Sequence, residues 1–263
     1  MKISPLMEAC INHPLLFATL LWFASFAGAP AAQIEATRTP IKAGSPQAQY
    51  RALVDDYEDA RKKFSDAYNK ASEQERKKLE YPAAEKFSEN FMTLAREHPT
   101  DPAGLDALVW VATNCRNQKE QEPALDLLLR NHLKSPKLAD VPMSLIYSES
   151  AKVEEFLRAL LKESPDHAVK GKAAYSLGCY LNRNDRNPKE AEKVFEEVAA
   201  QYPDVTGYRT SLADMAKSQL FEIRNLKIGQ VAPDITGKTV DGKKLKLSTY
   251  RGKVVVLDFW GDW

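Results

Sequence analysis

The sequence has little of what most catalytic and binding motifs require. It holds three cysteines and four histidines in 263 residues, and their spacing matches no zinc site. It contains neither a Gly-x-Ser-x-Gly motif nor a glycine-rich phosphate loop, so the sequence signatures of serine hydrolases and P-loop enzymes are missing. The formal net charge is +1, which gives no basic surface for nucleic acid. We therefore expect no metal, no cofactor and no nucleic-acid partner.

The N-terminus has the pattern of a secretory signal peptide. Lys2 precedes an apolar run from Leu15 to Ala27, and small residues follow it at Gly28-Ala29-Pro30-Ala31-Ala32. The run is shorter than the roughly 20 residues of a membrane span. We predict a signal peptide at 1–31 and export to a periplasmic or extracellular compartment. The alternative is an uncleaved segment, which would tether the protein to a membrane.

Export implies an oxidising compartment, which makes the remaining cysteines worth considering. Cys115 and Cys179 lie beyond the predicted cleavage site. They could form a disulfide, but their separation in sequence gives no evidence that they meet. The alternative is that both are small buried residues on helices.

A linker and a long helix are predicted next. Residues 32–49 carry Pro, Gly, Ser and Thr without periodicity, as flexible linkers do. From Tyr50 onward the apolar residues follow a seven-residue repeat. This predicts one amphipathic helix that continues to Tyr81-Pro82. The residues of its apolar face are Tyr50, Tyr57, Phe64, Ala71, Leu53, Ala60 and Ala67.

Four amphipathic segments then each end in a proline, and successive prolines are about 30 to 40 residues apart. The prolines are Pro99, Pro136, Pro165 and Pro203. Such a period is typical of helix-turn-helix arrays. The last unit is the clearest: we predict a first helix that begins at Tyr175-Ser176-Leu177-Gly178, a polar loop from Asn182, and a second helix opened by Pro188.

These units resemble tetratricopeptide repeats, in which small residues let paired helices pack closely. The alternative is a loose all-helical bundle. In either case residues 50–225 form one helical domain. Such a domain often presents a concave surface to a protein partner, and it can equally serve as a spacer.

The pattern changes again after Leu226. Asp241-Gly242 lies between alternating apolar and polar residues, which predicts a β-hairpin. Val254 to Phe259 is an almost continuous apolar run rich in β-branched residues. That run predicts a central strand buried on both faces.

The order of motifs in this last part is specific. Gly-x-x-Ala-Pro-Asp starts at Gly229, and Asp-Gly follows at Asp241. Leu-x-Leu-Ser-x-Tyr-Arg-Gly-Lys starts at Leu245, and Val-Val-Leu-x-Phe-Trp starts at Val255. This order resembles the opening of exported TlpA-like thiol-disulfide oxidoreductases, which are redoxins of the thioredoxin superfamily. The resemblance implies that residues 226–263 are the N-terminal part of an α/β thioredoxin-like fold acting on a protein disulfide or dithiol.

The resemblance also assigns roles to residues near the end of the sequence. The family's Cys-x-x-Cys pair would follow Trp263, so both redox cysteines are missing here. Asp258 matches a buried aspartate that accepts the proton of the resolving thiol, and the alternative is an incidental polar residue at a strand end. Trp260 and Trp263 match tryptophans that flank the active-site loop, where packing is their simplest role.

The multidomain fold class is therefore all-α followed by part of an α/β fold, and the favoured function is that of an exported thiol-disulfide oxidoreductase. We predict that this chain alone is inactive. One alternative is a non-catalytic exported helical scaffold that binds a protein partner. Another is a peroxiredoxin-type antioxidant, although Phe259-Trp260 favours the Cys-x-x-Cys branch of the superfamily.

Overall fold

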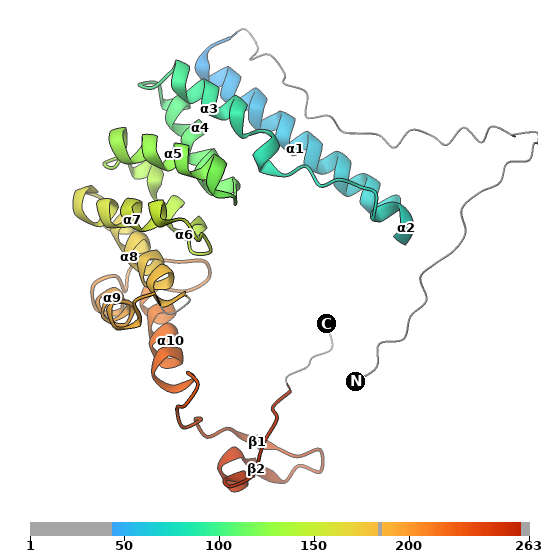
Figure 1. The fold of residues 1–263 in the computed structure, drawn as a ribbon, viewed down its shortest axis with the longest axis vertical. Helices are drawn as coiled ribbons and strands as arrows, with labels where there is room; N and C mark the ends of the chain where they lie inside the picture. Colours follow the sequence, from blue (N-terminus) through green and yellow to red (C-terminus); the bar gives the residue numbers. More distant parts are fainter. Residues whose placement is uncertain (1–43, 184–185, 259–263) are drawn as a thin grey trace, which may run out of the picture. The chain divides into compact units, whose positions relative to one another are not determined.

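The computed structural model describes residues 44–183 and 186–258 (Figure 1). The predicted signal peptide, most of the predicted linker, and both Trp260 and Trp263 lie outside the described residues. No helix of the described part has both the length and the apolar character needed to cross a bilayer.

Helices account for most of the described chain. In chain order they are α1 (Pro46–Lys70), α2 (Glu73–Arg76), η1 (Ala84–Lys86), α3 (Ser88–Glu97), α4 (Pro102–Asn114), α5 (Gln118–Asn131), η2 (Pro136–Leu138), α6 (Val141–Ser144), α7 (Ala151–Glu163), α8 (His167–Asn182), α9 (Pro188–Gln201) and α10 (Leu212–Asn225). Two short strands and a 3₁₀ turn follow, namely β1 (Thr236–Lys238), β2 (Lys244–Lys246) and η4 (Leu247–Tyr250).

The predicted long helix is present as α1, but both of its ends differ from the prediction. It begins at Pro46 because the Ser45 hydroxyl caps it, accepting the Ala48 N–H at 3.3 Å. The last four residues of the predicted linker are therefore helical. The helix stops at Lys70, well before Tyr81-Pro82, because Ser72 opens the separate helix α2 with a capping box.

The predicted prolines do mark helix ends. Helices α3, α5, α7 and α9 each stop a few residues before one of the four prolines. A proline lacks a backbone N–H and pushes the residue before it out of the helical region, so this effect is local and strong. Pro188 opens α9 as predicted, and Asn187 caps it by accepting the Glu190 N–H at 3.3 Å.

The predicted start of the first helix in the last repeat-like unit was wrong. Helix α8 begins at His167, not at Tyr175, because the Asp166 carboxylate accepts the Val169 N–H at 2.9 Å and caps the helix there. The segment from Tyr175 to Gly178 lies inside α8 and is buried.

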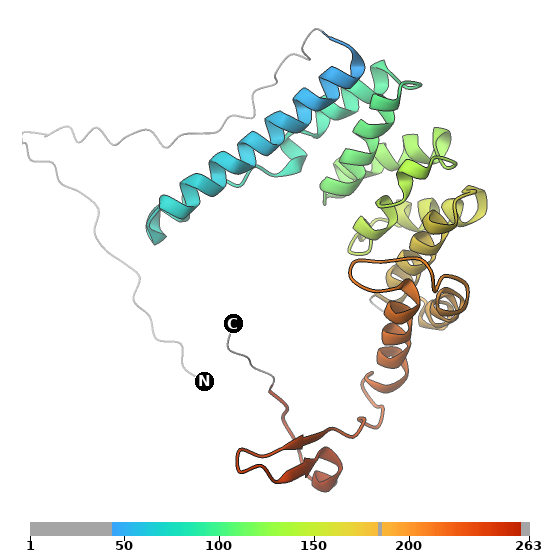
Figure 2. The same cartoon turned by 180° about the vertical axis from the view of Figure 1, so that it is seen from behind.

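Helices that follow one another in the sequence pack on one another. Contacts join α3 to α4, α4 to α5, α5 to α7, α7 to α8, α8 to α9 and α9 to α10, while α1 packs on α3 and α4 (Figures 1 and 2). The apolar faces form one continuous core. Phe91, Phe156 and Phe195 are fully buried in it, and burying one such side chain stabilises the fold by about 1.5–3 kcal/mol.

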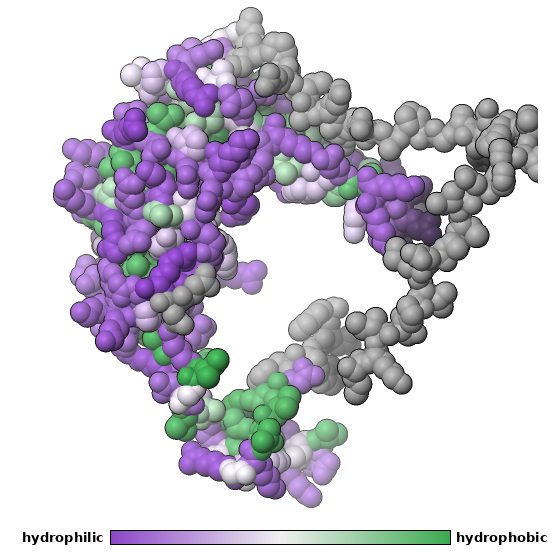
Figure 3. Space-filling model, viewed as in Figure 1, coloured by the Kyte–Doolittle hydropathy of each residue, from purple (hydrophilic) through white to green (hydrophobic). Residues whose placement is uncertain are grey.

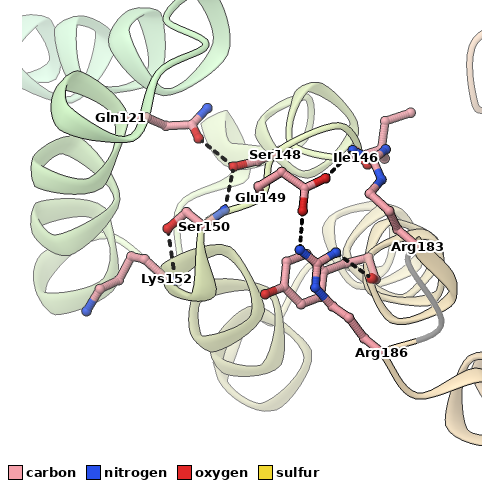
Figure 4. A network of polar contacts seen from close by, with 9 residues as sticks. Gln121, Ile146, Ser148, Glu149, Ser150, Lys152, Arg183 and Arg186 are labelled. Carbon is pink, nitrogen blue, oxygen red and sulfur yellow. Dashed lines mark hydrogen bonds and ion pairs between the residues drawn. The ribbon is translucent and has the colours of Figure 1, made fainter. Parts of the chain in front are cut away.

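A buried amide fastens the turn between α6 and α7 to the rest of the core. The Gln121 amide nitrogen donates to the carbonyls of Ala112 and Cys115 at 3.2 and 3.1 Å. Its oxygen accepts the Ser148 hydroxyl at 3.0 Å (Figure 4). A buried amide needs partners for both its nitrogen and its oxygen, and here the nitrogen binds the end of α4 while the oxygen binds the turn after α6.

The other side of the same turn is held by charge. The Glu149 carboxylate pairs with Arg183 and Arg186, which follow α8, and Arg183 also donates to the Ile146 carbonyl at 2.5 Å (Figure 4). The hydrogen bond from Arg186 is the main reason that the pKa of Glu149 lies below its usual range. The loop after α8 is thereby tied to the turn before α7.

The predicted hairpin is confirmed. Strands β1 and β2 pair antiparallel, with Thr236 opposite Lys246 and Lys238 opposite Lys244. Gly242 adopts a φ of +78°, which a residue with a side chain rarely adopts, so the Asp241-Gly242 turn needs its glycine.

The strand predicted for Val254 to Phe259 is not formed in its described part. Residues 254–258 have no assigned strand, and Val254 and Val256 are 98% and 88% exposed. A strand requires a hydrogen-bonded neighbour, and in the described chain the only sheet pairs β1 with β2. The apolar pattern alone was therefore not enough to make this strand.

Close packing of α8 on α9 gives a test of the helical core. A Cβ on Gly178 would lie 2.7 Å from the Phe195 ring, so we expect Gly178→Ala to lower the free energy of unfolding by about 1–2 kcal/mol despite its gain in helix propensity. Urea denaturation measures this. In a Phe195→Leu background the same substitution should cost nothing further. A Gly178→Ala chain more stable than the parent would contradict the packing.

Candidate functional site

The structure does not assemble the predicted redox site from the described residues. Asp258 is exposed and lies at the end of the described chain. Trp260 and Trp263 lie outside the described residues. The proton-relay role of Asp258 and the flanking roles of the tryptophans therefore stay predictions.

The structure instead shows what the Ala-Pro-Asp motif does. The Asp234 carboxylate accepts the Ser248 backbone N–H at 2.8 Å and the Ser248 hydroxyl at 2.9 Å. The Leu247 N–H donates to the Ile235 carbonyl at 2.9 Å. These bonds, which we call the Asp234 clasp, join the segment before β1 to η4 after β2.

The clasp also explains the electrostatics of its carboxylate. The Ser248 N–H, followed by the Ser248 hydroxyl, holds the pKa of Asp234 below its ordinary value, because both hydrogen bonds favour the ionised form. Sequence reasoning used Asp234 only as a family motif. Its partner Ser248 lies 14 positions away in the sequence, so no local pattern around Asp234 indicated this role.

An apolar cavity of about 350 Å³ lies beside the clasp. The apolar residues that line it come from the segments before β1, in η4 and after it, and they include Val231, Pro233, Leu247, Tyr250, Val255 and Leu257. Figure 3 shows hydrophobic side chains gathered around this hairpin region. Several of them are highly exposed, which is unusual for side chains so apolar.

Neither Cys115 nor Cys179 supplies a redox centre. Cys115 and Cys179 are both free thiols, so the disulfide alternative is not formed. Burial, with help from Glu85 and Glu120, raises the pKa of Cys115 to about 12. Burial likewise raises the pKa of Cys179 to about 11, although a hydrogen bond to Tyr175 opposes it.

Raised pKa values make both thiols poor nucleophiles, because the thiolate is the attacking species and little of it exists near neutral pH. Cys115 is buried at the end of α4, as the packing alternative expected, and Cys179 is half-buried in α8. Among the described residues no group of three or more His, Cys, Asp or Glu side chains could hold a metal ion.

Comparisons with known proteins find short similarities, and the family match lies in the hairpin region. The model of the AhpC/TSA family matches residues 228–263. Two proteins named thiol-disulfide oxidoreductase ResA, from Bacillus thuringiensis subsp. konkukian (strain 97-27) and Bacillus cereus (strain ATCC 10987 / NRS 248), are each 42% identical to this chain over 38 residues. The matched segment is similar to redoxins of the thioredoxin superfamily.

Each of these matches is short. It covers 14% of this chain and 22% of the relative, so the chain spans about a fifth of the length of the curated proteins it matches. No solved structure matches the chain. The family match at residues 228–263 includes the clasp and the hairpin and begins after the last residue of α10.

The lowered pKa of Asp234 makes a pH prediction. The clasp is complete above the ordinary aspartate pKa of about 3.9 and is lost as the pH falls through the lower folded-state value. In an NMR titration the Ser248 amide proton should therefore shift with a midpoint below about 3.9.

Two variants sharpen this test. Asp234→Asn should abolish the titration of the Ser248 amide, whereas Asp241→Asn in the hairpin turn should leave it unchanged. A midpoint at or above the ordinary aspartate value would show that the carboxylate does not hold Ser248.

Proposed function

We propose that this chain is part of an exported thiol-disulfide oxidoreductase of the thioredoxin/TlpA type. In this proposal residues 1–31 are its signal peptide, residues 50–225 form a tetratricopeptide-like helical domain, and residues 226–263 begin the redox domain. The nucleophilic cysteine pair would follow Trp263. The substrate class is a protein disulfide or dithiol.

One observation carries the proposal. The segment that matches the AhpC/TSA family model, residues 228–263, is the segment that forms the Asp234 clasp, the hairpin and η4. The motifs are thus joined in space as well as in order. Three unrelated short motifs would have no reason to meet in this way.

The chemistry of the proposed enzyme requires a thiolate that attacks a substrate disulfide. The attack forms a mixed disulfide and expels one substrate thiolate, and the second enzyme cysteine then displaces the other. An acceptor for the resolving thiol's proton would help that step, which is the role we propose for Asp258. The thiols of Cys115 and Cys179 do not suit it, because burial keeps both protonated.

The AhpC/TSA match keeps a peroxiredoxin-type antioxidant as the second candidate. Both branches share the matched segment. The ResA similarity and the sequence Phe259-Trp260 favour the disulfide oxidoreductase. The two candidates differ in substrate, since one exchanges disulfides and the other consumes peroxide.

The reading frame beyond Trp263 and two activity assays test the proposal. A protein extended to include the following residues should reduce insulin disulfides in the presence of dithiothreitol and show little peroxide consumption. The 263-residue chain should do neither, and neither should its Cys115→Ser and Cys179→Ser variants. A following sequence without cysteine would refute the redox proposal, and peroxide consumption without insulin reduction would favour the second candidate.

A further inference from the structure

A groove in the helical part has a chemistry that the redox proposal does not use. It has a volume of about 480 Å³, within the roughly 300–1,000 Å³ range of ligand sites. Residues from α4, from the neighbourhood of α6, from α8 and from the loop between α9 and α10 line it. We call this the α4–α8 groove.

Two tyrosines give the groove exposed aromatic surface. Tyr147 and Tyr208 both line it, and they are 73% and 62% exposed. Tyr208 is fixed in place because its hydroxyl donates to the Met143 carbonyl at 2.7 Å. Arg183 lies over the Tyr147 ring, with its guanidinium carbon 5.0 Å from the ring centroid. Rigid, exposed tyrosines are favoured residues at protein-binding surfaces.

Arg116 supplies positive charge beside these rings. Its guanidinium donates to the Ser144 carbonyl at 3.1 Å and forms no ion pair with a described carboxylate, although its backbone N–H donates to the Glu85 carboxylate at 2.7 Å. By contrast, Arg158 and Arg224 each pair with two glutamates. The pKa of Tyr208 is raised mainly by burial and is also affected by Tyr147 and Arg116, as expected for groups that lie near one another.

A second cation lies on the groove wall. The Lys172 ammonium contacts the Asp140 carboxylate at 2.7 Å. The lysine side chain is only 16% exposed, whereas that of Asp140 is 87% exposed. Asp140 also lines the groove, so an incoming carboxylate reaches Lys172 by displacing this exposed partner.

The groove also offers acceptors. The hydroxyls of Thr113 and Ser144 donate to carbonyls of their own segments, at Val109 and Val141. The Thr113 oxygen also accepts the Asn114 amide at 3.1 Å, which leaves it one lone pair, and Ser144 keeps acceptor capacity for an N–H donor. Two cations, hydroxyl acceptors and aromatic rings together match a polypeptide better than they match a small anion, because a small anion has no N–H groups and no apolar side chain to place.

We propose that the α4–α8 groove binds an acidic peptide segment, with a carboxylate on Arg116 and an adjacent apolar side chain against Tyr147 and Tyr208. Arginine and a carboxylate form a bidentate pair, which fixes orientation as well as attraction. The proposal concerns the helical part alone and stands whether or not the redox proposal does. It gives the predicted partner of the helical domain a chemical class.

Selection from a random octapeptide display library on the 263-residue chain tests this proposal. Peptides that pair Asp or Glu with a neighbouring apolar residue should be enriched. Their affinity should then be measured by fluorescence anisotropy. We expect Arg116→Ala to weaken binding at least tenfold and Arg116→Lys to restore only part of it, because lysine cannot make the bidentate pair. Tyr147→Ala should weaken binding severalfold.

Arg130→Ala is the matched control, since Arg130 is also exposed but does not line the groove. It should bind the selected peptides as the parent does, and thermal unfolding should show that Arg116→Ala remains folded. Enrichment of neutral or basic peptides, or equal binding by Arg116→Ala, would overturn the proposal. Displacement of the peptides by inorganic phosphate at equal concentration would show a small-anion site instead.

Discussion

The apolar face of each amphipathic helix needs a neighbour, and in this protein the next helix in the sequence usually supplies it. From α3 to α10 the longer helices contact one another in chain order, while the short helix α6 packs on α4 and α8. Glycines make the approach close enough: a Cβ on Gly171 would meet the Tyr202 ring, and one on Gly178 would meet the Phe195 ring. The core is therefore built from interactions that are local in sequence, and such cores form readily.

The hairpin region is held together by polar contacts, not by a buried apolar core. Its order comes from the clasp of Asp234 on Ser248 and from the β1–β2 pairing, which are polar and short-range. Its apolar residues remain largely exposed, among them Val254 and Val256. An apolar run with an unpaired backbone is a known aggregation hazard, and it is also the surface that a larger sheet would cover. The segment that matches the AhpC/TSA family, residues 228–263, includes this apolar run.

Features determined by single residues were predictable from the sequence. Pro99, Pro136, Pro165 and Pro203 each follow a helix end, and Asp241-Gly242 makes a tight turn with little help from the rest of the chain. Features that depend on a competing cap or on a partner were missed. Asp166 caps α8 and makes it begin before the predicted residue, and Ser72 begins α2 where the prediction continued α1. The strand predicted at Val254 has no neighbouring strand among the described residues. The α4–α8 groove could not be predicted, because Arg116, Tyr147 and Tyr208 meet only through the packing of distant helices.

Amide hydrogen exchange along the 263-residue chain tests the central contrast most directly. Slow exchange is expected in α8 and α9, whose backbone bonds are covered by the core, and nearly unprotected exchange is expected at Val254–Leu257. The measurement must be made on the monomer, since association could cover the apolar run. Strong protection of Val254–Leu257 in the monomer would contradict the account. It would show that the backbone of this segment is hydrogen-bonded, whereas the described structure pairs it with no strand.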